Sequence, residues 1–297
     1  MPDTSQKSLG FPPQSLGAEP ERLPVLYVSA DALALATTPA PTPATAATAA
    51  VADATAAAPL AAALCARYAE SRPEFLALPF RPPCGAVWPP ETDVHSIAVF
   101  AARGEALARW RNAFGSDGFL FTYSLLAADA PECDIPDAFV CELPVARHTR
   151  EVRALVSRTT GKKSRTEFRC LARAGRWSWW EARTSYPRFH QVRLHAAESG
   201  LLVVGERFYA DGGEIAAAQL LPKGRLNKGV SRPLHDGVCL RLASVDCAAA
   251  DPAAGLLVAP EPPKWVALRR RLALASASGL TPPPARASSD ARDFLRR

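Results

Sequence analysis

The segment YPRFHQVRLH, residues 186 to 195, is the most informative stretch of this chain. It places two histidines and two arginines between the aromatic run WSWWEARTS (177–185) and the apolar run LLVVGERFY (201–209). Polar side chains at this density are unusual between strand-like runs, because buried polar groups need hydrogen-bond partners. The segment is therefore a candidate functional site within an otherwise apolar framework.

Composition limits what this site can be. The chain has 297 residues, of which 48% are hydrophobic, and carries a net charge of +6, a mild form of the signature of polyanion binders. Its seven cysteines are odd in number and form no C-x-x-C pair, which predicts reduced thiols and neither a disulfide framework nor a zinc site. We expect no metal and no cofactor.

The N-terminus and the hydropathy pattern indicate an intracellular protein. Residues 1–17 lack the apolar core of a secretory signal, and no run approaches the roughly 20 apolar residues of a membrane helix. We therefore expect a protein that is not secreted, does not contact a membrane and is a monomer, in the cytoplasm or in an organelle.

Strand-like runs outnumber helical ones, which predicts a single α+β domain with a bent, mostly antiparallel, multistranded sheet and peripheral helices. We expect a disordered segment over residues 1–22, a domain over 23–246 with an Ala/Thr/Pro-rich insertion at about 36–55, and a C-terminal extension over 247–297 with one helix and a disordered tail. The predicted helices are 56–69, 104–114, 189–200 and 264–277; the predicted strands are 96–102, 118–129, 137–146, 165–175, 176–184, 201–209 and 238–246.

The order of motifs after Thr166 resembles the C-terminal half of RluA-type RNA pseudouridine synthases. Residues 187–195, PRFHQVRLH, match that family's G-R-x-H-Q-I-R-x-H motif except at the glycine, and residues 205–210, GERFYA, are similar to its G-D-x-x-Y-G turn. RPLHDGVCLRL (232–242) is similar to the closing strand. Upstream the resemblance is weaker, with LPVLYVSADALAL (23–35) similar to the opening strand pair and Tyr123 at the position of a family tyrosine. The resemblance implies a pseudouridine synthase-like fold and structured RNA, rRNA or tRNA, as partner.

The family's catalytic H-R-L-D-x-x-T-S-G motif is degraded in this chain. Its counterpart before the strand 96–102 is WPPETDVHS (88–96), which puts Glu91 at the position of the nucleophilic aspartate and Asp93 two residues away. The resemblance implies that Arg188 is the ion-pair partner of this carboxylate and that Tyr123 stacks on the flipped-out base. A glutamate adds one methylene, and a displacement of about 1 Å can cost roughly 100-fold in rate.

Basic and polar side chains supply candidate RNA contacts. A run of charges between residues 147 and 165 and the segment 223–232 are candidate phosphate contacts, although such a run is more often a solvated face. The tryptophans of WSWW could stack on bases, but packing against the core is the better interpretation. The candidate RNA-binding residues are His190, Gln191, Arg193, His195, Lys162, Lys163, Arg165, Lys223 and Arg225.

Two functions therefore stay open at the level of the sequence. The chain is either a pseudouridine synthase that uses Glu91 or Asp93 to isomerise uridine, or a catalytically inactive relative that serves as an RNA-binding scaffold or ribonucleoprotein assembly factor. An unrelated basic, β-rich protein is a third interpretation. The degraded catalytic motif favours the scaffold, whereas the retained Tyr123 and Arg188 favour the enzyme.

Overall fold

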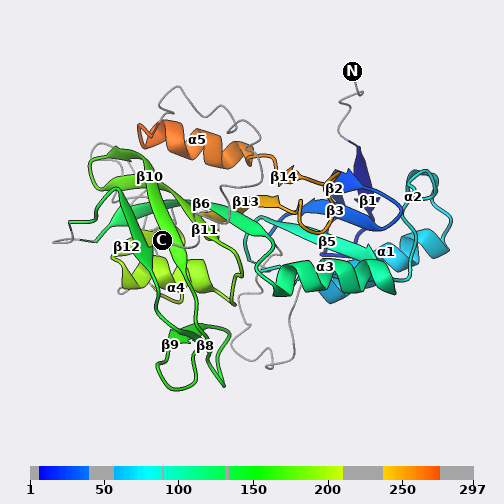
Figure 1. Ribbon diagram of the computed structural model, residues 1–297. Helices are drawn as coiled ribbons and strands as arrows, with labels where there is room; N and C mark the ends of the chain where they lie inside the picture. The colour runs from blue at the N-terminus through cyan, green and yellow to red at the C-terminus, as the bar shows by residue number, and fades with distance from the viewer. Residues whose placement is uncertain are drawn as a thin grey trace.

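In the computed structural model, residues 7–39, 57–88, 90–91, 93–130, 134–209 and 237–274 are described, and they form two antiparallel sheets (Figure 1). The first sheet has the order β1-β2-β3-β5-β4. Its strands are β1 (Ser8–Phe11), β2 (Glu21–Val28), β3 (Ala32–Thr37), β4 (Cys84–Ala86) and β5 (Ser96–Ala102).

The second sheet has the order β14-β13-β6-β11-β10-β7, and β12 pairs with β6 from outside this path. The long β6 is central, because it pairs with β11, β13 and β12. A separate two-stranded ribbon joins β8 to β9. The strands are β6 (Leu120–Asp129), β7 (Ala138–Cys141), β8 (Val145–Arg147), β9 (Ala154–Val156), β10 (Thr166–Ala174), β11 (Trp177–Thr184), β12 (Leu201–Val203), β13 (Leu240–Asp246) and β14 (Leu256–Val258).

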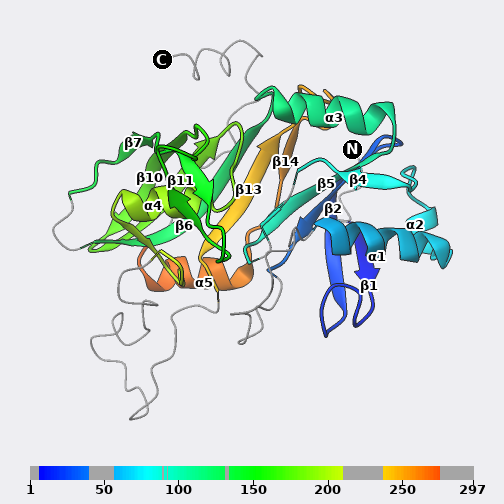
Figure 2. The ribbon, with the colours of Figure 1, turned by 90° about the horizontal axis from the view of Figure 1, so that it is seen from below.

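The two sheets meet where β5 begins beside β13. His95 and Arg241 form an isolated parallel bridge, and the backbone N–H of Leu242 donates to the His95 carbonyl at 2.9 Å. Seen from below, β5 and β13 run side by side between the two halves of the molecule (Figure 2). The described residues that precede β5, residues 88, 90–91 and 93–95, therefore lie at the junction of the two sheets.

Alternation along the strands separates the apolar layers. Phe121, Tyr123 and Leu125 of β6 point into the main core, while Leu126 and Ala128 point to the opposite face. The main core continues under both sheets and receives apolar side chains from the helices α3 (Glu105–Gly115) and α4 (Gln191–Glu198).

The remaining helices cover the outer faces. α1 (Ala57–Ala69) and α2 (Pro73–Leu76) pack on the other face of the first sheet, and α5 (Pro263–Arg271) packs on the second sheet opposite α4 (Figure 1). Trp265 of α5 is fully buried against Leu126 and Trp179. None of the helices in the described ranges combines the length and the apolar character that a membrane crossing needs.

The expected α+β class with antiparallel sheets is confirmed, although two sheets replace the single bent sheet. The strand predicted at 201–209 is shorter than expected, because β12 ends at Val203 and a turn follows. Packing of WSWW against the core is confirmed, since Trp180 faces the main core and Trp177 and Trp179 face α5. The described cysteines, Cys65, Cys84, Cys141, Cys170, Cys239 and Cys247, are free thiols.

Two predicted segment boundaries differ from the structure. The expectation of disorder over residues 1–22 is wrong for residues 8–11, because β1 pairs with β2 and buries Leu9 and Phe11. The expected C-terminal extension is not separate from the domain, because β14 pairs with β13 and α5 covers the sheet. The insertion begins after β3, which ends at Thr37, and its residues 40–56 lie outside the described ranges, as do residues 275–297.

Candidate active site

The segment that carries Glu91 and Asp93 is anchored at both ends. Trp88 is buried, donates its indole N–H to the Ile97 carbonyl at 3.2 Å and packs edge-on against Phe121 with ring centroids 5.0 Å apart. At the other end Val94 is buried in the main core. The two acidic residues are therefore held at the junction of the sheets.

The facing side of the site begins at the N-terminus of α4, where Gln191 secures the turn. Its side-chain oxygen accepts the backbone N–H of Arg188 at 2.9 Å, and its amide nitrogen donates to the Thr166 hydroxyl at 2.9 Å. His190, the residue before the helix, has φ 53°, in the left-handed region that non-glycine residues rarely adopt. Arg193 follows in the first turn of α4, and its side chain reaches Asp93 of the acidic segment.

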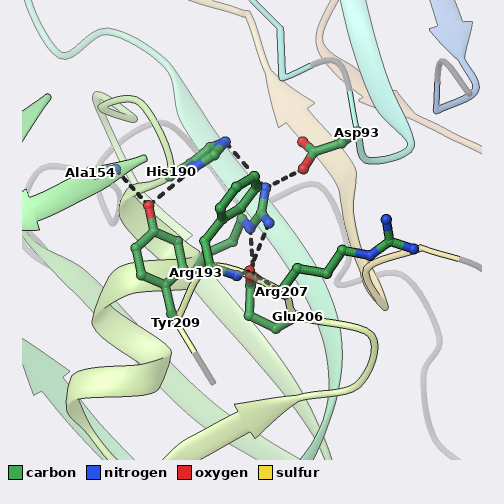
Figure 3. Close-up of polar contacts among 8 residues, drawn as sticks. Asp93, Ala154, His190, Arg193, Glu206, Arg207 and Tyr209 are labelled. Atoms are coloured by element: carbon green, nitrogen blue, oxygen red, sulfur yellow. Dashed lines mark hydrogen bonds and ion pairs between the residues drawn. The ribbon is translucent and has the colours of Figure 1, made fainter. Parts of the chain in front are cut away.

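Arg193 joins three parts of the chain (Figure 3). Its Nε and Nη2 donate to the two carboxylate oxygens of Glu206 at 2.6 and 2.8 Å, and its Nη1 forms an ion pair with Asp93. The Arg193 side chain has no exposed surface. Burial opposes its charge, but the hydrogen bonds to Glu206 and the surrounding carboxylates raise the pKa of Arg193 above its usual value.

Glu206 is positioned by the glycine before it. Gly205 has φ +77°, and a Cβ atom at this position would lie 1.9 Å from the Gly237 carbonyl oxygen, so the turn requires glycine. The Glu206 carboxylate also accepts the backbone N–H groups of Arg207 and Phe208, each at 2.9 Å. The turn thus presents the Glu206 carboxylate to the buried guanidinium of Arg193.

His190 and Tyr209 close one side of this network. The Tyr209 hydroxyl oxygen accepts the Ala154 backbone N–H at 2.6 Å and lies 3.0 Å from His190 Nδ1, while His190 Nε2 lies 3.2 Å from Nη1 of Arg193 (Figure 3). Because a guanidinium only donates, Nε2 accepts and the proton of a neutral imidazole sits on Nδ1. Burial, with the charge of Arg193, lowers the pKa of His190 to about 3, consistent with a neutral ring.

The two carboxylates at the junction differ in their surroundings. Burial raises the pKa of Glu91 to about 8, although Arg193 and the His190 backbone N–H act in the opposite direction. Asp93 is ion-paired with Arg193 through Oδ2, and its side chain is 21% exposed. Each acid has one buried oxygen without a hydrogen-bond partner, Oε2 of Glu91 and Oδ1 of Asp93.

Tyr123 borders this cluster from β6. Its pKa is raised well above the usual value by burial and by the nearby charge of Glu91. The side chain belongs to the main core and is only 6% exposed. Tyr123 is therefore a buried core residue near Glu91.

Glu91, Asp93 and His190 also have the residue types of a metal site. One ligand atom from each lies within 4.8 Å of the others. The sequence predicted no metal, and that prediction did not consider Glu91 and Asp93. The guanidinium of Arg193 already neutralises Asp93 at this position, which disfavours a cation there.

Arg188 does not have the partner that its position in the motif predicted. Its guanidinium lies 4.4 Å from the centroid of the Tyr186 ring, and its buried Nε has no hydrogen-bond partner. The ion pair with the acidic segment is made instead by Arg193, because the left-handed turn at His190 aims the first turn of α4 inward. The structure thus shows an ion pair of the acidic segment with Arg193 and none with Arg188 among the described residues, and the catalytic role of Arg188 stays a prediction.

Direct RNA contact is contradicted for Gln191 and His195. Both are fully buried, and His195 is paired through Nδ1 with the Thr166 hydroxyl and through Nε2 with the Leu143 carbonyl, each at 2.9 Å. His190 and Arg193, at 2% and 1% exposure, also serve the internal network and are not surface contacts.

The candidate phosphate contacts fall into three groups. Lys162 and Lys163 are exposed, and Lys162 is fixed by a backbone bridge to Val145 of β8. Arg165 is ion-paired with Glu142 and Glu167 at 2.6 and 2.7 Å, which leaves less of its charge for RNA. Lys223 and Arg225 lie outside the described residues.

Sequence reasoning missed the bidentate pair of Arg193 with Glu206. The signal was available, because both residues stand in the two best-matched motifs, HQVRLH and GERFYA. Two motifs that recur together in a fixed order often place their charged members in contact.

Comparisons with known proteins agree with the resemblance. No protein-family model matches the chain. A segment of 83 residues, 27% of the chain, is 30% identical to an uncharacterized RNA pseudouridine synthase of Synechocystis sp., and it spans 28% of that protein's length. The recognition of an RluA-type pseudouridine synthase relative is thereby supported over part of the chain.

Solved structures extend the likeness to the fold. The human RNA pseudouridylate synthase domain containing protein 4 matches with a TM-score of 0.60 and 14% identity over 84% of this chain and 92% of that one. The human RNA pseudouridylate synthase domain containing protein 1 matches with a TM-score of 0.48 and 13% identity over 83% of this chain and 94% of that one. The match with a TM-score of 0.60 shows that the chain has the pseudouridine synthase fold, as its motifs predicted.

Proposed function

We propose that this protein isomerises uridine to pseudouridine in structured RNA, rRNA or tRNA, with Asp93 as the nucleophilic carboxylate and Arg193 as its ion-pair partner. The observation that carries the proposal is the ion pair between these two side chains at the junction of the sheets. The fold and the partial sequence match to an RNA pseudouridine synthase support the same reaction class.

A nucleophilic carboxylate must be ionised and must keep an oxygen free for the reacting atom. Arg193 forms an ion pair with Oδ2 of Asp93 and so holds a positive charge beside this carboxylate. Only Oδ2 is used in this pair, and Oδ1 is buried without a partner. Buried polar atoms rarely stay unpaired, so Oδ1 is a suitable atom to meet the ribose.

Glu91, which stands at the aspartate position of the family motif, is the weaker candidate for this role. With a pKa of about 8 it carries a proton at neutral pH, and a protonated carboxyl is a poor nucleophile. The two residues differ in their relation to Arg193, since only Asp93 forms an ion pair with it. The geometry therefore favours Asp93.

The test is release of tritium from RNA labelled at carbon 5 of uridine, with transcripts of ribosomal RNA and transfer RNA as substrates. Wild type is expected to release tritium, and Asp93→Asn is expected to abolish release while RNA affinity is retained. Glu70→Gln is the matched control, because Glu70 is exposed and lies directly after α1. This variant should behave like wild type. Release that persists in Asp93→Asn would refute the assignment.

A catalytically inactive RNA-binding scaffold is the second candidate, and one observation favours it. Tyr123 is only 6% exposed, so its ring offers little surface to an incoming base. Under this alternative the ion pair of Arg193 would only stabilise the fold. No tritium release from any of these RNAs, together with retained RNA binding, would support the scaffold and overturn the enzyme.

A further inference from the structure

We infer that Glu91 is a second catalytic group of this site, which exchanges the proton that moves between carbon 5 and nitrogen 1 of the uracil ring. This inference rests on the proposed function and adds to it, because the family motif has one acid in this segment, at the position of Glu91, whereas this chain has a second acid at Asp93. Glu91 then has a chemical role distinct from that of Asp93.

The geometry places Glu91 beside the reacting carboxylate. One oxygen each of Glu91 and Asp93 and one ring nitrogen of His190 lie within 4.8 Å of one another. The backbone N–H of His190 lowers the pKa of Glu91 and thus lies near its carboxyl group, while Oε2 of Glu91 is buried without a partner. The carboxyl group of Glu91 therefore lies beside the carboxylate of Asp93, where we place the reacting base.

The reaction needs such a group because one proton must leave carbon 5 of the uracil ring and one proton must be added to nitrogen 1. The bond between N1 and C1′ breaks with its electron pair left on N1, as an Asp93 oxygen bonds to C1′. Carbon 5 then attacks C1′ with its ring π electrons and displaces Asp93, and loss of the C5 proton restores the double bond. A protonated Glu91 gives its proton to N1, and the carboxylate that results takes the proton from C5, so no net proton is gained or lost.

The groups around Glu91 keep it in the state that this exchange requires. It faces Arg193 of α4, Asp93 of its own segment, Glu206 after β12 and Tyr123 of β6, with the neutral His190 beside it. Burial and the two neighbouring acids raise its pKa to about 8, against the attraction of Arg193. At neutral pH Glu91 is therefore protonated, and a carboxyl with a pKa near the working pH is well suited to both steps.

The test compares wild type, Glu91→Gln and Glu70→Gln on RNA with hydrogen or deuterium at carbon 5 of uridine. Glu91→Gln keeps the shape of the side chain but cannot exchange a proton, so turnover should fall by roughly 100-fold or more. Loss of the C5 proton should then limit the rate, and the deuterium isotope effect should exceed that of wild type. Activity of wild type should fall above about pH 8, where Glu91 ionises, and the slow variant should lack this fall.

The outcomes separate this inference from the proposed function. If Asp93→Asn is inactive but Glu91→Gln turns over like wild type with an unchanged isotope effect, the role of Glu91 is overturned and that of Asp93 stands. If Glu91→Gln is slow but has the isotope effect and pH profile of wild type, Glu91 is only structural and the inference also fails. If wild type does not isomerise uridine, the proposed function and this inference fall together.

Discussion

At the scale of single residues, the site depends on how one buried guanidinium is shared. Arg193 satisfies both oxygens of Glu206 and still binds Asp93, so removal of either acid would leave a charge without full compensation. His190 must stay neutral to accept a hydrogen bond from the same guanidinium. These requirements explain why the motif that contains Arg193, HQVRLH, lies against the motif that contains Glu206, GERFYA.

The titration of Glu91 should be visible in the stability of the protein. The folded pKa of about 8 lies above the ordinary value of 4.5, so the folded state holds more protons between these values and loses stability as the pH rises from 4.5 to 8. Glu91→Gln removes this loss. The free energy of unfolding of the variant relative to wild type should therefore increase between pH 5 and pH 8, by an amount on the order of a few kcal/mol.

Chemical denaturation at several pH values measures this difference. His190, with a folded pKa of about 3, has the opposite effect, because stability falls as the pH drops below 6.5. That contribution is common to wild type and variant and cancels in the comparison. A difference that stays constant from pH 5 to pH 8 would show that Glu91 is ionised in the folded state.

At the scale of elements, α4 and the β8–β9 ribbon have separate tasks. α4 delivers Arg193 to the interior, whereas the ribbon, held to α4 by contacts of Val145 and Ala154 with Leu194, supports exposed basic residues near the site. Lys162 pairs through its backbone with β8 and is exposed. The ribbon is thus the best candidate for phosphate contact.

We predict that Lys162→Ala with Lys163→Ala weakens RNA binding and flattens its salt dependence. Removal of one lysine–phosphate interaction should reduce the slope of log affinity against log salt by roughly 0.7 to 0.9. Affinities for transcripts of transfer RNA at several salt concentrations would measure this slope. Lys7→Ala with Arg109→Ala removes the same charge elsewhere and should leave the slope unchanged. If the slope of log affinity against log salt is the same for both double variants and wild type, Lys162 and Lys163 belong to a solvated surface that does not contact RNA.

The elements themselves could largely be predicted from sequence periodicity. Long segments such as 118–129 and 104–114 have strong patterns and became β6 and α3. β1 was missed, because four residues between proline- and serine-rich stretches give too short a pattern, and Leu9 and Phe11 acquire their burial only from α2 and its neighbours. The identity of the paired arginine depended on the left-handed turn at His190, which no periodicity encodes.

At the scale of the whole molecule, the site exists because two sheets are joined. Glu91 and Asp93 come from the segment before β5, while Arg193 and Glu206 belong to the half built on β6 and β13. Motif order predicted that these parts meet. The choice between Glu91 and Asp93 could not be made from the motif, because it depends on which of these two acids meets Arg193 at the junction of the sheets.

The central claim is that the acid held by Arg193 is the nucleophile. It is tested most directly by a single-turnover reaction with uridine-containing RNA, quenched in acid and digested for mass spectrometry. The peptide that spans both acids should carry a ribose-linked nucleotide, and fragmentation should locate the label on Asp93. Asp93→Asn should carry none. A label on Glu91, or isomerised product without any label on Asp93, would contradict the account.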